Sequence, residues 1–74
     1  MNLKNYYKTL AKNIRIERIK NEISQFQLAE MAEVSLETVG NIERAEGNPT
    51  ISTLIMIAKA LKVDLNTLLP LTWE

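Results

Sequence analysis

The chain has 74 residues, with nine basic and nine acidic side chains and neither cysteine nor histidine. This length suits one domain, and the missing residue types exclude zinc sites, disulfides and thiol or histidine catalysis, so we expect no metal or cofactor. There is no signal-peptide pattern and no apolar run of roughly 18 residues, so we expect a cytoplasmic protein that spans no membrane.

The first predicted helix carries an apolar stripe at helical spacing. The stripe consists of Leu3, Tyr7, Leu10 and Ile14, and its next position is Arg18. A charged side chain on an inward face is costly unless it meets a partner. The sequence therefore predicts a partner for Arg18 elsewhere in the chain.

The second predicted helix has a strong start signal. Ser24 can cap the unpaired backbone N–H groups, and Gln27, three residues later, completes a capping box. Ile23 and Leu28 occupy the flanking positions of a hydrophobic staple. We expect this helix to begin at Gln25.

The third predicted helix follows after a short break. Glu33 to Ser35 interrupt the apolar pattern, Ser35 supplies a second cap, and Val34 and Val39 repeat the staple. We expect this helix to run from Leu36 to about Arg44. Two short helices joined so closely are suited to presenting one of them to something outside the molecule.

Helical geometry assigns the faces of this third helix. At about 100° per residue, Val39, Ile42 and Glu43 point inward. The outward face is polar or small, and its members are Glu37, Gly40, Asn41 and Arg44. The inward Glu43 is explained economically by a bidentate ion pair with Arg18, the alternative being two solvated residues at the rim.

The C-terminal third predicts two more helices. Thr50 caps the first, whose apolar positions are Ile51, Leu54, Ile57, Ala58 and Leu61. Asp64 caps a last short helix, with Val63 and Leu68 as its staple, and Pro70 ends it. The predicted fold class is all-α.

These motifs together resemble a known family, the helix-turn-helix domains of phage Cro proteins and lambda-type repressors, also called the xenobiotic response element (XRE) family. The resemblance covers residues 10–69 and leaves 70–74 as a tail. The matching residues are Ile14, Arg15, Arg18, Ser24, Gln25, Leu28, Ala29, Val34, Ser35, Glu43, Pro49, Ala58, Ala60, Leu61, Val63, Asp64, Leu68 and Leu69. It implies that residues 1–74 form a single compact five-helix domain, with the helix-turn-helix at helices two and three.

The resemblance also implies that the third helix lies in the major groove of duplex DNA. The base-reading positions then fall on Leu36, Glu37, Thr38 and Asn41. Asn41 can bond bidentately to adenine, Glu37 can accept from the cytosine amino group, and Leu36 or the Thr38 methyl can contact a thymine methyl. The alternative for Glu37 and Asn41 is a solvated face.

A second group of residues is expected to contact phosphates. The resemblance assigns this role to Gln25, at the N-terminus of a helix, where partial positive charge favours anions, although capping alone would also explain the motif. We expect Arg15, Arg44 and Asn48 to contribute. Residues 1–20 carry six basic residues and one acidic residue, a net +5, whereas the remainder carries three basic and eight acidic, a net −5. The basic first helix can thus approach phosphates although the whole chain is neutral.

Related repressors bind inverted-repeat operators as two-fold dimers. Here the expected dimer surface consists of Leu65, Leu69, Leu71 and Trp73, and Ile16 and Ile19 form a second apolar area. The alternative is that the tail folds back and covers these areas within one chain.

Relatives often have glycine where this chain has Glu22, Glu33 and Ala45, at helix ends that favour a left-handed backbone. We expect Asn21 and Gly47 to take over two of these turns, because asparagine and glycine tolerate positive φ.

The favoured function is a sequence-specific DNA-binding regulator, a repressor that acts by occupying its operator. An enzyme is disfavoured, because no paired carboxylates and no glycine-rich phosphate loop are present. A protein-interaction module on the same fold, of antitoxin or antirepressor type, remains the alternative and is favoured slightly by Phe26, Glu37 and the zero net charge.

Overall fold

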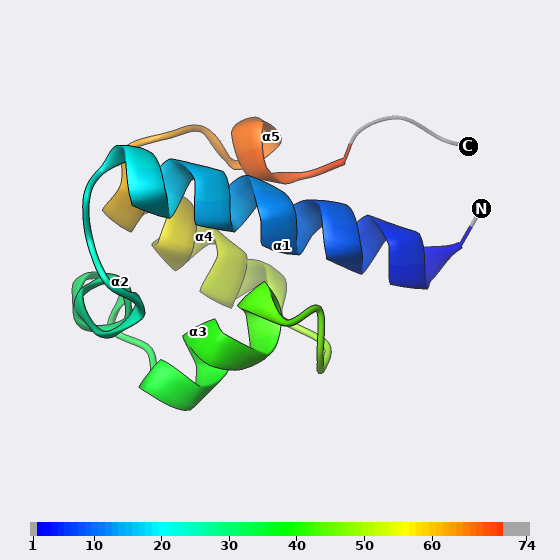
Figure 1. Cartoon of the computed structure of the whole chain (residues 1–74), viewed down its shortest axis with the longest axis horizontal. Helices are drawn as coiled ribbons and strands as arrows, with labels where there is room; N and C mark the ends of the chain where they lie inside the picture. Colours follow the sequence, from blue (N-terminus) through cyan, green and yellow to red (C-terminus); the bar gives the residue numbers. More distant parts are fainter. Residues whose placement is uncertain (1, 71–74) are drawn as a thin grey trace.

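The computed structural model describes residues 2–70, which form five helices and confirm the all-α prediction (Figure 1). The helices are α1 (Leu3–Lys20), α2 (Gln25–Ala32), α3 (Leu36–Glu43), α4 (Ile51–Leu61) and α5 (Leu65–Leu68). None of these helices combines the length and the apolar character needed to cross a bilayer.

The predicted caps fix where the two central helices begin. The Ser24 hydroxyl oxygen accepts from the Gln27 backbone N–H at 3.0 Å, and the Gln27 side chain accepts from the Ser24 N–H at 2.8 Å. The Ser35 hydroxyl accepts from the Thr38 N–H at 3.0 Å. Thr50 caps α4 in the same way. These bonds satisfy N–H groups that a helix start leaves unpaired.

The last helix begins differently from the prediction. Asp64 occupies the N-cap position, but its side chain makes no capping hydrogen bond, so that part of the prediction is wrong. The single turn of α5 is held instead by contacts with the body. Leu68 is fully buried, and the Asn13 side chain of α1 donates to the Leu68 carbonyl oxygen at 2.9 Å.

The turns between helices use left-handed residues that are not glycine. These are Glu22, Glu33, Ala45 and Lys62, with φ between 57° and 61°. Each such residue costs on the order of 1 kcal/mol relative to glycine. Gly47 is also left-handed, but Ala45 keeps its own left-handed turn, so the expectation that Asn21 and Gly47 take over two of these turns is wrong. Asn21 keeps a right-handed backbone and donates from its side chain to the Glu17 carbonyl oxygen, so the turn falls on Glu22.

All five helices contribute buried side chains to one core. Its largest fully buried side chains are Ile14, Leu28, Val39, Ile57, Leu61 and Leu68. The predicted apolar stripe is wrong at Leu3, whose side chain remains 60% exposed. The first turns of α1 extend beyond the other described helices, so none of these helices covers Leu3 (Figure 1).

A buried ion pair joins α1 to α3. Arg18 Nε donates to Glu43 Oε2 at 2.8 Å and Arg18 Nη2 donates to Oε1 at 3.1 Å, which is the bidentate arrangement expected from the sequence. Glu43 is only 4% exposed. Arg18 Nη1 also donates to the Ile23 carbonyl oxygen at 3.0 Å. Each charge therefore has the partners that burial requires.

Two further bonds converge on Glu43. Gln25 Nε2, at the start of α2, donates to Glu43 Oε1 at 3.2 Å. Arg15 Nη1 donates to the Glu43 backbone carbonyl oxygen at 2.8 Å, at the C-terminal end of α3. Glu43 thus connects α1, α2 and α3, and it fixes the angle at which α3 is presented.

We predict that Arg18→Ala lowers the free energy of unfolding by about 3 kcal/mol, because it leaves the Glu43 carboxylate buried without its cation. Urea denaturation followed by circular dichroism measures this change.

The matched control is Lys20→Ala, which removes an exposed pair with Glu17 whose N–O distance is 3.5 Å. This control should cost less than about 1 kcal/mol, since exposed pairs contribute little. Equal stability of the Arg18→Ala and Lys20→Ala variants would show that the Arg18–Glu43 pair does not hold the fold.

Candidate nucleic-acid interface

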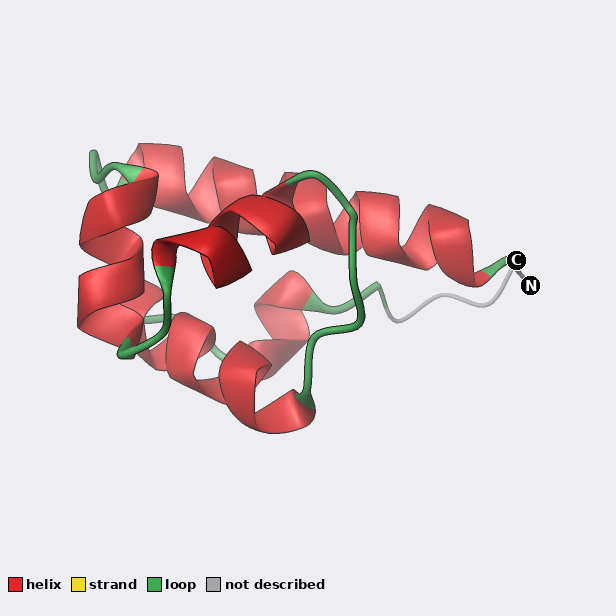
Figure 2. Cartoon of the chain, turned by 90° about the horizontal axis from the view of Figure 1, so that it is seen from below, coloured by secondary structure: helices red, strands yellow, loops and turns green. Residues whose placement is uncertain are grey.

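One flank of α3 lies free of the other described helices. Figure 2 shows α3 at the front of the molecule, with no helix between it and the viewer. Val39, Ile42 and Glu43 are buried on the opposite side, as helical geometry predicted. The free flank therefore carries the residues that the sequence assigned to base reading.

These residues differ in how they are held. Leu36 is 49% exposed and Glu37 is exposed. Thr38 is half-buried, and its hydroxyl shares a 2.8 Å hydrogen bond with the Ser35 hydroxyl. The Thr38 hydroxyl thus contributes to the start of the helix, which leaves its methyl group for apolar contact.

The prediction that Gly40 lies on the outward face of α3 is wrong, because Gly40 is buried. The cause is Arg44, whose side chain folds back along the helix. A Cβ added at Gly40 would lie 2.9 Å from Arg44 Nη1. Arg44 Nη2 donates to Asn41 Oδ1 at 2.6 Å, and Arg44 Nε donates to Glu46 Oε1 at 3.1 Å.

Two amide side chains near α3 each have one group engaged in an intramolecular hydrogen bond. Gln25 Nε2 gives a hydrogen bond to Glu43, and this nitrogen carries a second N–H. Asn48 Oδ1 accepts from the Tyr7 hydroxyl, so the Asn48 NH₂ group remains to donate. Thr38, Asn41 and Asn48 line the same open groove beside α3.

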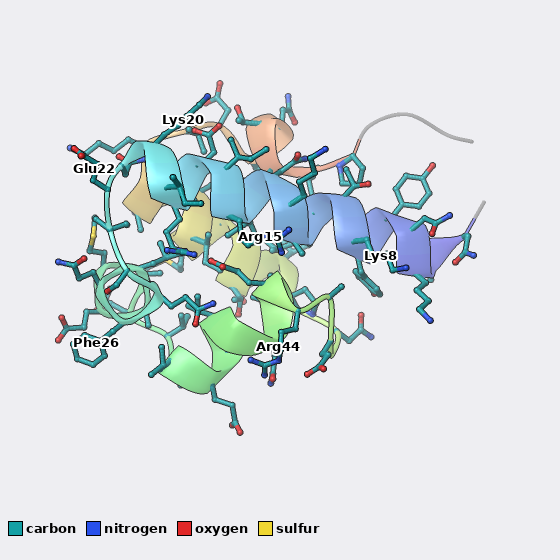
Figure 3. All side chains as sticks on the ribbon, viewed as in Figure 1. Lys8, Arg15, Lys20, Glu22, Phe26 and Arg44 are labelled. Carbon is teal, nitrogen blue, oxygen red and sulfur yellow. The ribbon has the colours of Figure 1, made fainter. Side chains whose placement is uncertain are left out.

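Basic side chains gather on the other side of α3. Lys8, Lys12 and Arg15 of α1 line one open groove with Arg44. Figure 3 labels three of them, Lys8, Arg15 and Arg44, on neighbouring parts of α1 and α3. Sequence reasoning did not single out Lys8 and Lys12 as contacts. Their spacing of four residues, with Arg15 three further on, places all three on one helix face and was the available signal.

Of the four residues expected at a dimer surface, the structure describes Leu65 and Leu69. Leu65 and Leu69 are half-buried and pack against the core. Leu71 and Trp73 lie outside the described residues. Ile16 and Ile19 of α1 are exposed, as expected for a second apolar area.

A helix-turn-helix family and two relatives match most of this chain in sequence. The HTH_3 helix-turn-helix family matches residues 14–68. The control protein C.SmaI of Serratia marcescens is 47% identical over 60 residues, which are 81% of this chain and 71% of that protein. The immunity repressor protein of Bacillus phage phi105 is 35% identical over 60 residues, but the chain spans only 42% of its length.

A solved structure has the same fold. The restriction-modification controller protein C.AhdI from Aeromonas hydrophila superimposes with a TM-score of 0.81 at 24% identity, covering 84% of this chain and 94% of that one. At this identity the likeness concerns the fold alone. The family match over most of the chain goes further: the chain belongs to the HTH_3 helix-turn-helix family of DNA-binding transcriptional regulators, which are not enzymes.

Proposed function

We propose that this chain is a sequence-specific duplex-DNA binder that acts in the cytoplasm as a repressor, by occupying its operator. The observation that carries the proposal is the free flank of α3, bordered on both sides by groups that can donate to phosphates. The resemblance to a control protein and to a phage immunity repressor supports a regulatory role.

In this proposal α3 enters the major groove. Asn41 reads adenine through its amide, and Glu37 accepts from a cytosine amino group. Leu36 and the Thr38 methyl contact thymine methyl groups. The exposed Glu37 also repels phosphates wherever no cytosine is in register, which lowers affinity for wrong sites.

Phosphate contacts position α3 on the duplex. Gln25 donates through its second N–H at the positive end of α2, and Asn48 donates through its NH₂ group. The groove lined by Lys8, Lys12 and Arg15 contacts the DNA phosphates from the side of α1. The sequence also assigned Arg44 to a phosphate, and its charge lies in this groove.

We also propose that the chain binds an inverted-repeat operator as a homodimer, with Leu65, Leu69, Leu71 and Trp73 at the dimer surface. Support comes from Leu65 and Leu69, which are half-exposed, and from Ile16 and Ile19 of α1, which are exposed. Sedimentation with the mass of one chain, at concentrations that saturate an operator, would contradict the dimer.

Affinity for a random duplex should fall steeply with salt, since each phosphate neutralised releases counterions. Fluorescence anisotropy at several salt concentrations measures the slope of log K against log salt. Lys12→Ala should reduce the steepness of this slope by about 1, whereas Lys59→Ala, on α4 and outside the groove, should leave it unchanged. Absence of binding at low salt would instead favour a protein-interaction module.

Gln25→Ala and Asn41→Ala should weaken binding in different ways. Loss of a phosphate contact lowers affinity for all sequences alike, whereas loss of a base contact lowers discrimination at one base pair by about 1–3 kcal/mol. Titrations against an operator and its single-base variants separate the two effects. Because Gln25 also bonds to Glu43, thermal melting of both variants is the control. Equal losses on every sequence for Asn41→Ala would contradict its reading role.

A further inference from the structure

Arg44 is held differently from an ordinary surface arginine. Its guanidinium is fixed by two acceptors, Asn41 Oδ1 at 2.6 Å and Glu46 Oε1 at 3.1 Å. These bonds fold the side chain back over α3 and hold it against Gly40. The charge therefore lies on the free flank of α3, beside Asn41, as well as bordering the basic groove.

Gly40 makes this position available. Glycine is the poorest helix former after proline, so its presence in the middle of α3 needs a compensating role. A Cβ at this position would approach Arg44 Nη1 to 2.9 Å, closer than real Cβ contacts. The atom in the way belongs to the end of a flexible side chain, so alanine would displace the guanidinium and leave the helix intact.

The unused hydrogen-bond donors of Arg44 match one base. A guanidinium has five N–H groups, and the bonds to Asn41 and Glu46 use two of them. The three that remain include both N–H groups of Nη1. The remaining N–H of Nη2 and the neighbouring N–H of Nη1 form a pair that fits guanine, which presents O6 and N7 as acceptors in the major groove. Adenine places an amino group where guanine has O6, so it satisfies only one of them.

Asn41 keeps its own role in this arrangement. Its carbonyl oxygen has two lone pairs, one of which accepts from Arg44, and the other remains for the adenine amino group. The hydrogen bond between Arg44 and Asn41 places the two side chains next to each other, so they contact neighbouring base pairs.

We propose that Arg44 is a specificity-determining residue that reads guanine next to the base pair read by Asn41, and that Gly40 provides the space in which it does so. This proposal rests on the DNA-binding function proposed above and assigns Arg44 a base contact in place of a phosphate contact.

The test is selection of bound duplexes from a random pool, followed by titration of the selected operator and its single-base variants. The wild-type chain should prefer G·C at one position beside the Asn41 pair. Arg44→Lys keeps the charge but cannot bond bidentately, so the preference at this position should fall about 10-fold or more, a larger loss than the loss of affinity for random duplex. Gly40→Ala should lose the same preference without a lower melting temperature.

A double variant provides the matched control. If Gly40 acts through Arg44, Gly40→Ala should not lower the preference for G·C any further in an Arg44→Ala background. Two results would overturn the inference without contradicting DNA binding. In the first, Arg44→Lys and Gly40→Ala select the same operator as the wild-type chain, with unchanged affinity ratios between the operator and its variants. In the second, Arg44→Ala loses the same affinity on all sequences and has a shallower salt slope, which is the behaviour of a phosphate contact. Failure of the wild-type chain to bind any duplex would overturn the proposed function as well.

Discussion

The buried carboxylate of Glu43 is the constraint on which the rest of the structure depends. An ionised group that is 4% exposed must be paired, and its partners come from two other helices, Arg18 of α1 and Gln25 of α2. The same requirement that keeps the charge tolerable also fixes three helices relative to one another. In a chain of this size, with a small core, one polar cluster thus determines how α3 is presented.

A second feature recurs around α3: polar side chains are oriented by intramolecular partners before any ligand is present. Glu43 holds the Gln25 amide, Tyr7 holds the Asn48 amide, and Arg44 holds the Asn41 amide. In each case the remaining hydrogen-bonding capacity is left for a ligand. Side chains ordered in advance lose less conformational entropy on binding, which favours a specific contact over a merely electrostatic one.

Local signals in the sequence predicted more of the structure than tertiary ones. The caps at Ser24, Ser35 and Thr50 and the inward faces of the central helices depend only on spacing within a few residues. The burial of Gly40 depends on the rotamer of Arg44, and the exposure of Leu3 depends on how far the start of α1 extends beyond the other described helices. Residue spacing does not determine the Arg44 rotamer, although Arg44 lies only four residues after Gly40, and the exposure of Leu3 depends on tertiary packing. The ion pair of Arg18 with Glu43 could be predicted from the sequence despite a separation of 25 residues, because each charge occupied an inward position and needed a partner.

The measurement that tests this account most directly is a nuclear magnetic resonance titration of the ¹⁵N-labelled chain with its selected operator. The account predicts the largest shifts at the α3 amides and at the side-chain NH₂ signals of Gln25, Asn41 and Asn48, with α5 and the second half of α4 little changed. Shifts concentrated on α4 and α5, with α3 unaffected, would contradict the claim that the free flank of α3 is the surface that contacts DNA.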